Sequence, residues 1–188
     1  MKKIVLIILI ILHSCSKSHN DFIISKEYSI TNIDSLSYEN YFKKHPNGDH
    51  PISIFLKNSS NNKLKEFVIE TLLTYDGAKV EELIVNRFDN VEKVLRVSYG
   101  YDGADCILEY SKYFIVTNSK QLIDFPLVEN QYCDGPTPII EYRFPNQKFG
   151  TPNQIILVKS FLNDDFKVKS IKEIKSYKWD GKSIELEK

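Results

Sequence analysis

The sequence has few of the features that mark nucleic-acid-binding proteins and the common enzyme classes. Basic and acidic residues balance, with 25 of each, and the arginines are limited to Arg87, Arg96 and Arg143. A nucleic-acid partner requires a clustered basic face, so no such partner is expected. The serine-hydrolase G-x-S-x-G, the zinc-peptidase H-E-x-x-H, the P-loop and the dinucleotide glycine fingerprint are all absent from the sequence. No cofactor is therefore expected, and no familiar catalytic class is indicated.

The sequence also lacks an apolar run long enough to cross a membrane as a helix. Its longest apolar run, Ile4 to Leu12, follows Lys2 and Lys3 and precedes Ser14-Cys15. At 1.5 Å per residue this run covers about half of a ~30 Å hydrocarbon core. A positive start, a short apolar run and a small residue are typical of an export signal.

The end of this signal, Leu12-His13-Ser14-Cys15, resembles the lipobox of bacterial lipoproteins. The resemblance implies cleavage before Cys15 and lipidation of that cysteine, and the simplest alternative is a plain secretory signal. Residues 1–14 would then be the signal peptide, residues 15–21 the lipidated cysteine and a short tether, and residues 22–188 one exported domain. Ser16 rather than Asp follows the cysteine, which by resemblance to the known sorting rule favours the outer membrane over the inner membrane.

Cysteine is scarce, with three residues in the chain. If Cys15 is lipidated, Cys106 and Cys133 remain as an even pair in an exported protein, where oxidation is permitted. We therefore predict a disulfide that closes a loop of about 28 residues and contributes ~3 kcal/mol by loop-entropy arithmetic. Two buried thiols, or a catalytic Cys106, are the alternatives.

Alternating apolar and polar residues predict a mainly β fold. The alternation is clearest over residues 95–101, 108–116 and 138–144, and the aromatic content of 12% favours pleated structure. Asp-Gly pairs, which favour tight turns, occur between such segments. The pattern predicts an antiparallel β-meander, either an open sheet or a partly closed barrel, with one or two helices near the N-terminal part. An α+β fold is the alternative.

Two N-terminal segments are assigned from their local patterns. Residues 22–30 are expected to form a first strand. Residues 34–44 are expected to form a helix, with Asp34 as its N-cap and Leu36 among the apolar residues on one side.

Two further segments fit either a helix or a strand. Residues 64–75 favour a strand, because Asp76-Gly77 would turn the chain back into a paired strand over residues 80–88. Residues 152–162 begin with helix-start residues, but the β-branched run after them favours a strand.

The predicted disulfide would bring acidic and aromatic residues together, which makes their surroundings the candidate site. This patch could bind a cationic partner or a Ca²⁺ ion, or could perform acid–base chemistry. The simplest alternative is that the aspartates only form turns and the tyrosines only pack. No metal ligand or catalytic residue is assigned, and the loop residues His45, Asp49 and His50 are a weaker metal candidate. The residues of the patch are Tyr101, Asp102, Asp105, Tyr132 and Asp134.

The combination of a lipid anchor, a disulfide-stabilised β domain and no catalytic motif indicates a binding module of the cell envelope. Inhibitors, immunity proteins and assembly accessories share this profile, so the expected partner is a protein or a small envelope component. The alternatives are an envelope hydrolase that uses the carboxylates near Cys106 and Cys133, or a structural spacer in an envelope complex.

Overall fold

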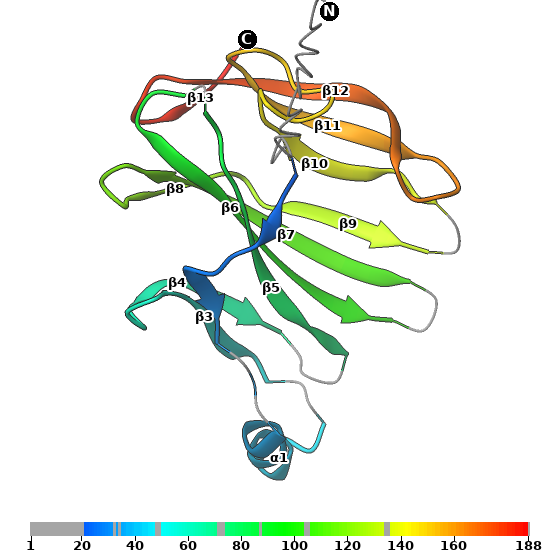
Figure 1. The fold of residues 1–188 in the computed structure, drawn as a ribbon. Helices are drawn as coiled ribbons and strands as arrows, with labels where there is room; N and C mark the ends of the chain where they lie inside the picture. Colours follow the sequence, from blue (N-terminus) through cyan, green and yellow to red (C-terminus); the bar gives the residue numbers. More distant parts are fainter. Residues whose placement is uncertain are drawn as a thin grey trace, which may run out of the picture.

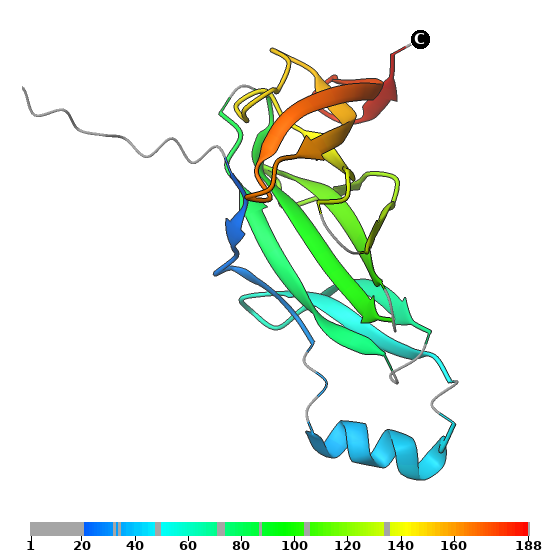
Figure 2. The ribbon, with the colours of Figure 1, turned by 90° about the vertical axis from the view of Figure 1, so that its right-hand side faces the viewer.

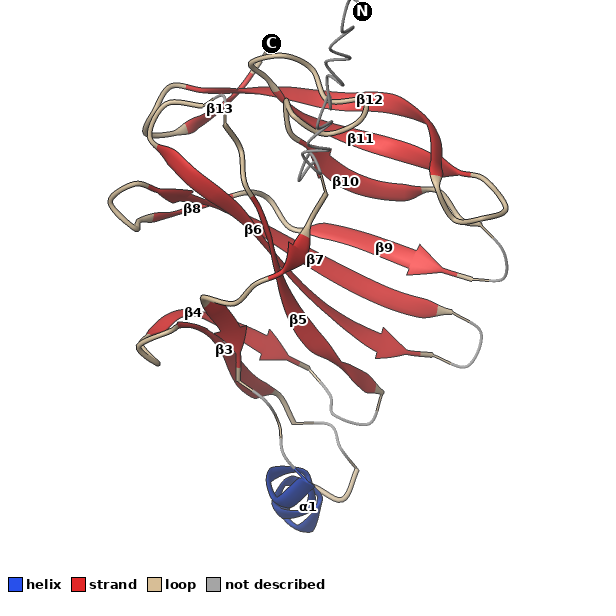
Figure 3. Ribbon diagram, in the orientation of Figure 1, coloured by secondary structure: helices blue, strands red, loops and turns tan. Residues whose placement is uncertain are grey.

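The computed structural model describes residues 21–187 except residues 32, 34, 48–49, 71–73, 87, 104–105 and 134–135. The described part confirms a mainly β fold of antiparallel sheets, with a single helix near the N-terminal part (Figures 1 and 3). The elements are β1 (Ile23–Ile24), β2 (Tyr28–Ile30), α1 (Ser35–Lys44), β3 (Ile52–Asn58), β4 (Lys63–Ile69), β5 (Tyr75–Leu83), β6 (Val91–Asp102), β7 (Ile107–Thr117), β8 (Leu122–Asp124), β9 (Val128–Tyr132), β10 (Ile139–Arg143), β11 (Ile155–Leu162), β12 (Val168–Trp179) and β13 (Ile184–Leu186).

Apart from β1, which joins the central sheet, three sheets follow one another along the chain. The N-terminal sheet has the order β2-β3-β4, and the C-terminal sheet has the order β10-β11-β12-β13. Between them lies the central sheet, β1-β5-β6-β7-β8, in which β9 also pairs with β7. The central sheet is strongly curled (Figure 1), and the other two sheets pack against its opposite faces.

The alternation of side chains in the central sheet separates two hydrophobic cores. One face presents Leu95 and Val97 of β6, which pack with the N-terminal sheet and with Tyr41 of α1. The opposite face presents Val94 of β6 and Ile115 of β7, which pack with the C-terminal sheet. Since neighbouring residues of a strand point to opposite faces, one strand supplies both cores.

The predicted first strand over residues 22–30 is divided between two sheets. β1 pairs with β5 of the central sheet, whereas β2 pairs with β3 of the N-terminal sheet. Ser25 lies between them, and its hydroxyl accepts hydrogen bonds from the backbone N–H groups of Glu27 and Tyr28 at 3.3 and 3.1 Å. This local turn lets the chain leave one sheet and enter the other.

The predicted hairpin at Asp76-Gly77 is wrong, although the preference for strand over residues 64–75 is confirmed for 64–69 and 75. β4 pairs with β3 across a turn at Asn58–Asn62, and β5 pairs with β6. Asp76 and Gly77 lie inside β5, at a register irregularity, and Gly77 has a φ of 103°. The Asp-Gly pair therefore forms a bulge within a strand, because a bulge also uses the positive φ that glycine adopts readily.

The helix predicted over residues 34–44 and the strand favoured within residues 152–162 are largely confirmed. Helix α1 begins at Ser35, and the proposed cap Asp34 lies outside the described residues. Leu36 is 64% exposed, so it does not share the packed side of the helix with Tyr41. Residues 155–162 form strand β11, and turn residues rather than a helix precede it.

Strand β10 carries two charged residues that are buried, although they are the polar positions of the alternating segment 138–144. Glu141 and Arg143 are 9% and 7% exposed. Arg143 Nη2 and Ser160 Oγ each donate a hydrogen bond of 2.5 Å to Glu141 Oε1. Residues two apart on a strand share a face, so these two side chains neutralise each other and their burial becomes tolerable.

The predicted disulfide between Cys106 and Cys133 is present. Cys106 directly precedes β7 and Cys133 directly follows β9. These two strands pair with Ile107 opposite Tyr132, so the disulfide joins the ends of two neighbouring strands of the central sheet.

We predict that replacing both disulfide cysteines, Cys106→Ala with Cys133→Ala, lowers the free energy of unfolding by about 2–4 kcal/mol, because the unfolded chain loses a covalent loop. Urea unfolding followed by the fluorescence of Trp179, the single tryptophan, measures the change. Reduction of the wild-type protein should give the same loss. A midpoint shared by the variant and the oxidised wild type would show that the disulfide does not stabilise the fold.

Candidate functional site

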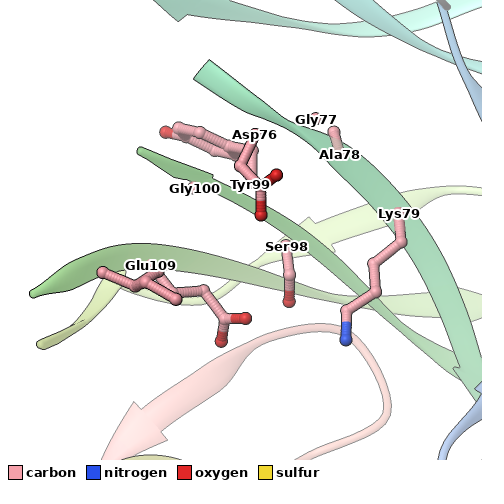
Figure 4. Close-up of a pocket in the computed structure, with 9 residues that line it drawn as sticks. Asp76, Gly77, Ala78, Lys79, Ser98, Tyr99, Gly100 and Glu109 are labelled. Carbon is pink, nitrogen blue, oxygen red and sulfur yellow. The ribbon is translucent and has the colours of Figure 1, made fainter. Parts of the chain in front are cut away.

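The face of the central sheet that packs against the C-terminal sheet is only partly covered. Beyond the covered part, towards the disulfide, the sheet surface forms a hollow of about 350 Å³. We call it the polar hollow (Figure 4). It is lined by Asp76, Gly77, Ala78, Lys79, Ser98, Tyr99, Gly100, Ile107 and Glu109.

Small side chains on adjacent strands create the polar hollow. Gly77 of β5 lies opposite Gly100 of β6, and Gly100 lies opposite Glu109 of β7. The next row along the sheet contains Ser98 and Ser111 on β6 and β7. Because glycine and serine fill little space, this part of the face is lower than the neighbouring rows. The bulky neighbours of these residues in the sequence point to the other side of the sheet.

A chain of hydrogen bonds orients the polar groups of the hollow. The hydroxyl oxygens of Ser98 and Ser111 are 2.9 Å apart. Ser111 Oγ and the Tyr132 hydroxyl both donate to Glu109 Oε1, each at 3.4 Å. Burial, together with the nearby Glu109 carboxylate, raises the pKa of Tyr132 well above its usual range. Tyr132 therefore keeps its proton and remains a donor to Glu109.

An ion pair bounds the polar hollow on its covered side. Arg96 lies in the row after Ser98 on the same face, and its Nη2 is 2.8 Å from Glu81 Oε2. Its guanidinium also lies 4.6 Å from the centre of the Phe22 ring. Burial disfavours the charge of Arg96, but the neighbouring Tyr113 and Glu81 outweigh it and raise its pKa above the usual range. This side of the hollow is thus a fixed, charged and aromatic wall.

The open side of the polar hollow carries exposed charge of both signs. Lys79 has a side chain that is 50% exposed and lies 3.7 Å from Glu81, and Asp76 is exposed on the bulge of β5. Ile107 adds an apolar edge that is 43% exposed. The hollow therefore offers carboxylate acceptors, an ammonium donor, hydroxyls and one apolar contact. Such a set suits a small polar ligand that has both hydrogen-bond donors and acceptors.

The residues of the candidate patch are divided between the two faces of the central sheet. Tyr132 lies at the polar hollow through its bond to Glu109. Tyr101 points to the opposite face, where it packs edge-on against Tyr75 and Tyr110 and its hydroxyl accepts the Glu70 N–H at 3.1 Å. Asp102 ends β6 and is exposed.

Three residues named from the sequence, Asp105, Asp134 and Cys15, lie outside the described residues. Ca²⁺ binding at the aspartates and lipidation at the cysteine stay predictions.

The described residues also bear on the weaker metal candidate. The rings of His45 and His50 have centroids 4.0 Å apart, whereas Asp49 lies outside the described residues. Over the described part of the chain, no group of three or more histidine, cysteine, aspartate or glutamate residues is arranged to hold a metal ion. No helix within that part has both the length and the apolar character needed to span a bilayer.

Searches for similar proteins returned no match of this chain to a family model, to a curated protein or to a solved structure.

The sequence analysis did not identify the residues that line the polar hollow. The sequence predicts a hairpin turn at Asp76-Gly77, and it gives no role to Ser98. A usable signal was present on β6, where small residues at 98 and 100 alternate with tyrosines at 99 and 101. Such alternation gives a flat, polar sheet face behind an aromatic one.

Replacing Arg96 tests whether the wall of the hollow is a fixed structural element. We predict that Arg96→Met lowers the free energy of unfolding by about 2–4 kcal/mol, because the largely buried Glu81 loses its partner. Lys120→Met is the matched control. It removes an ion pair with Glu92 in which the lysine side chain is 61% exposed, so it should leave urea unfolding unchanged. Equal midpoints for the two variants would contradict the assigned role of Arg96.

Proposed function

We propose that this protein is a lipid-anchored binding module of the cell envelope and that the polar hollow is its ligand site. The hollow, about 350 Å³ in volume, is the observation that carries the proposal. Ligand sites are concave, largely preformed and of about 300–1,000 Å³, so the hollow falls at the small end of that range.

The construction of the hollow supports binding of a small polar group. Its carboxylate at Glu109 is held by Ser111 and Tyr132 before any ligand arrives. A ligand therefore meets a positioned acceptor and does not have to order the side chain itself, which reduces the entropic cost of binding.

The chemistry of the hollow indicates the class of ligand. A saccharide offers hydroxyls that both donate and accept, and an amine-bearing envelope component offers donors for the two carboxylates. Lys79 supplies a donor to ligand oxygens, and Ile107 supplies an apolar contact to a sugar ring or a short carbon chain. A small envelope component or the tip of a protein partner would fit this set.

One observation favours a second candidate, an envelope hydrolase. Asp76 and Glu109 both line the polar hollow, and paired carboxylates can act as general acid and base on a glycosidic bond. This pair replaces the aspartates near the disulfide as the catalytic candidates of that alternative.

The lipid anchor supports placement in the envelope, with the outer membrane favoured by Ser16. Cys15 would carry the lipid, and residues 16–21 would tether the domain to the membrane surface. The domain would then act at a membrane, on a partner or component within reach of that surface.

The anchor is tested at Cys15. We predict that Cys15→Ser leaves the precursor uncleaved and free of lipid, because by resemblance to lipoproteins the acylated sulfur is required before the signal is cut. Cells fed labelled palmitate should label the wild-type protein and not the variant. Equal labelling of both proteins would reject the anchor.

The polar hollow is tested with substitutions that preserve shape. We predict that Asp76→Asn combined with Glu109→Gln weakens capture of the native envelope ligand at least about tenfold, because two charged acceptors become neutral ones. The measurement is a pull-down from detergent-solubilised envelope, with quantitative mass spectrometry of both proteins and small molecules.

The matched control for this pull-down is Glu39→Gln combined with Asp164→Asn, which changes the net charge equally at two exposed positions. Capture that falls equally in both double variants would reject the hollow as the site. Release of sugar products from envelope glycans by the wild type, with none from either Asp76→Asn or Glu109→Gln, would favour the hydrolase.

A further inference from the structure

The face of the C-terminal sheet that packs onto the central sheet is apolar at one end and basic at the other. At the apolar end, Ile155 and Tyr177 lie opposite each other and are buried in the core shared with the central sheet. Residues two apart on a strand share a face, so Lys159 and Phe161 of β11 continue this face beyond the core. Lys172 of β12 lies opposite Lys159 and belongs to the same face. We call Lys159 and Lys172 the lysine pair.

The central sheet faces this surface and changes character in the same direction. β7 contributes Tyr113 to the shared core and Glu109, four residues away on the same face, to the polar hollow. The ring of Tyr142 in β10 lies 5.1 Å from the ring of Tyr113. Ile140, two residues from Tyr142 on the same face of β10, packs against the core and pairs with Lys159. Both sheets therefore change from apolar to polar residues as they leave the shared core.

Asn130 shows that the polar ends of the two sheets lie together. It pairs with Glu109 across β9 and β7. Its side-chain amide donates a hydrogen bond to the carbonyl of Ile140 at 2.9 Å and accepts one from the N–H of Ile140 at 2.6 Å. Ile140 in turn pairs with Lys159. With paired strands about 4.8 Å apart and this hydrogen-bonded link between them, the backbones of Glu109 and Lys159 are separated by at most about 16 Å.

The lysine pair carries charge that the described part of the chain does not neutralise. Both lysines are exposed, neither forms an ion pair within that part, and Lys159 instead lies 5.9 Å from the centre of the Phe161 ring. Glu173 lies opposite Val158 and thus on the other face of the sheet. Like charges directly opposite each other destabilise a strand pair unless something screens them. The lysine pair is therefore suited to an external anion.

The lysine pair and the polar hollow belong to facing surfaces. The C-terminal sheet lies over one end of the central strands, which continue past it towards helix α1 (Figure 2). The side chains of Lys79, Ser98 and Glu109 all point to one side of the central sheet (Figure 4), which is the side that the C-terminal sheet covers. A lysine has a flexible four-carbon stem, so its ammonium group can reach a ligand that is held by Glu109.

We propose that the polar hollow and the lysine pair together bind an acidic saccharide, a sugar that carries a carboxylate or a phosphate. This proposal rests on the polar hollow being the ligand site, as proposed above, and it names the class of the ligand. The two ammonium groups bind the anion through charge-assisted hydrogen bonds. Glu109 and Ser98 bind sugar hydroxyls, and the ring of Phe161, which is 37% exposed, offers an apolar contact to the sugar ring. A ligand with amines alone would leave the lysine pair unscreened.

The experiment measures the affinity of the full chain in detergent for four soluble sugars by ligand-observed NMR titration. Glucuronic acid and glucose 6-phosphate are the acidic probes. The methyl ester of glucuronic acid and glucose are their neutral counterparts. Each acidic probe should bind with a Kd at least about tenfold lower than that of its counterpart, because only the acidic probe forms charge-assisted hydrogen bonds with the lysine pair.

The variant arm removes charge and keeps most of the side chain. Lys159→Gln combined with Lys172→Gln should abolish the preference for the acidic probes and leave the affinity for the neutral probes unchanged, which also shows that the variant is folded. The matched control, Lys43→Gln combined with Lys44→Gln, makes the same change in net charge at two exposed positions of α1 and should keep the preference. Asp76→Asn combined with Glu109→Gln should weaken binding of both neutral probes.

The outcomes separate this proposal from the proposed function on which it rests. Neutral probes that bind through the hollow, with acidic probes that bind no more tightly, would overturn the role of the lysine pair and leave the hollow as the site. An acidic preference that depends on the lysine pair, with no probe affected by Asp76→Asn and Glu109→Gln, would overturn the shared site and reject the hollow.

Two further results bear on the class of ligand. Inorganic phosphate that binds as tightly as glucose 6-phosphate would show that the lysine pair binds a free anion, and would overturn the saccharide assignment. Wild-type protein that binds none of the four sugars would overturn it as well, whereas the pull-down from envelope still decides whether the polar hollow is a ligand site.

Discussion

The central strands β6 and β7 must satisfy different neighbours on their two faces, and this constraint organises the molecule. On one face, the N-terminal sheet covers the apolar residues of these strands and also the tyrosine-rich end of β6. On the other face, the apolar rows are covered by the C-terminal sheet. Where that cover ends, the residues on the same face change from apolar to small and polar, as at Ser98 and Gly100. The polar hollow is thus the uncovered end of a sheet face whose other end is core.

Three devices hold the hollow in shape without a ligand. The disulfide ties the ends of β7 and β9, and so fixes Ile107 and Tyr132 beside each other. The Arg96–Glu81 pair closes the covered side. The bulge at Gly77 bends β5 where it borders the hollow, because a bulge increases the local twist of a strand. A site that is built before its ligand arrives spends little binding energy on ordering, which suits a binding module.

Much of the fold follows from alternation and turn chemistry in the sequence, and most of the site does not. The alternation of β6, β7 and β10 and the disulfide were predictable from the sequence. Which face of a strand receives cover depends on sheets formed far away in the chain, so the burial of Ser98 and of Glu141 was not predictable. The hairpin predicted at Asp76-Gly77 was wrong because a hairpin turn and a bulge both require a residue with positive φ, so the Asp-Gly pair does not distinguish them.

If the polar hollow is the ligand site, a component of the envelope should occupy it in native membranes. Hydrogen–deuterium exchange of the wild-type protein in native envelope vesicles, compared with the same protein purified in detergent, measures this occupancy segment by segment. We predict slower exchange in the vesicles over residues 76–79 and 98–100, and no such slowing in the variant that combines Asp76→Asn and Glu109→Gln. Exchange over these segments that is the same in vesicles and in detergent, or that slows equally in the variant, would contradict the assignment of the hollow as the ligand site.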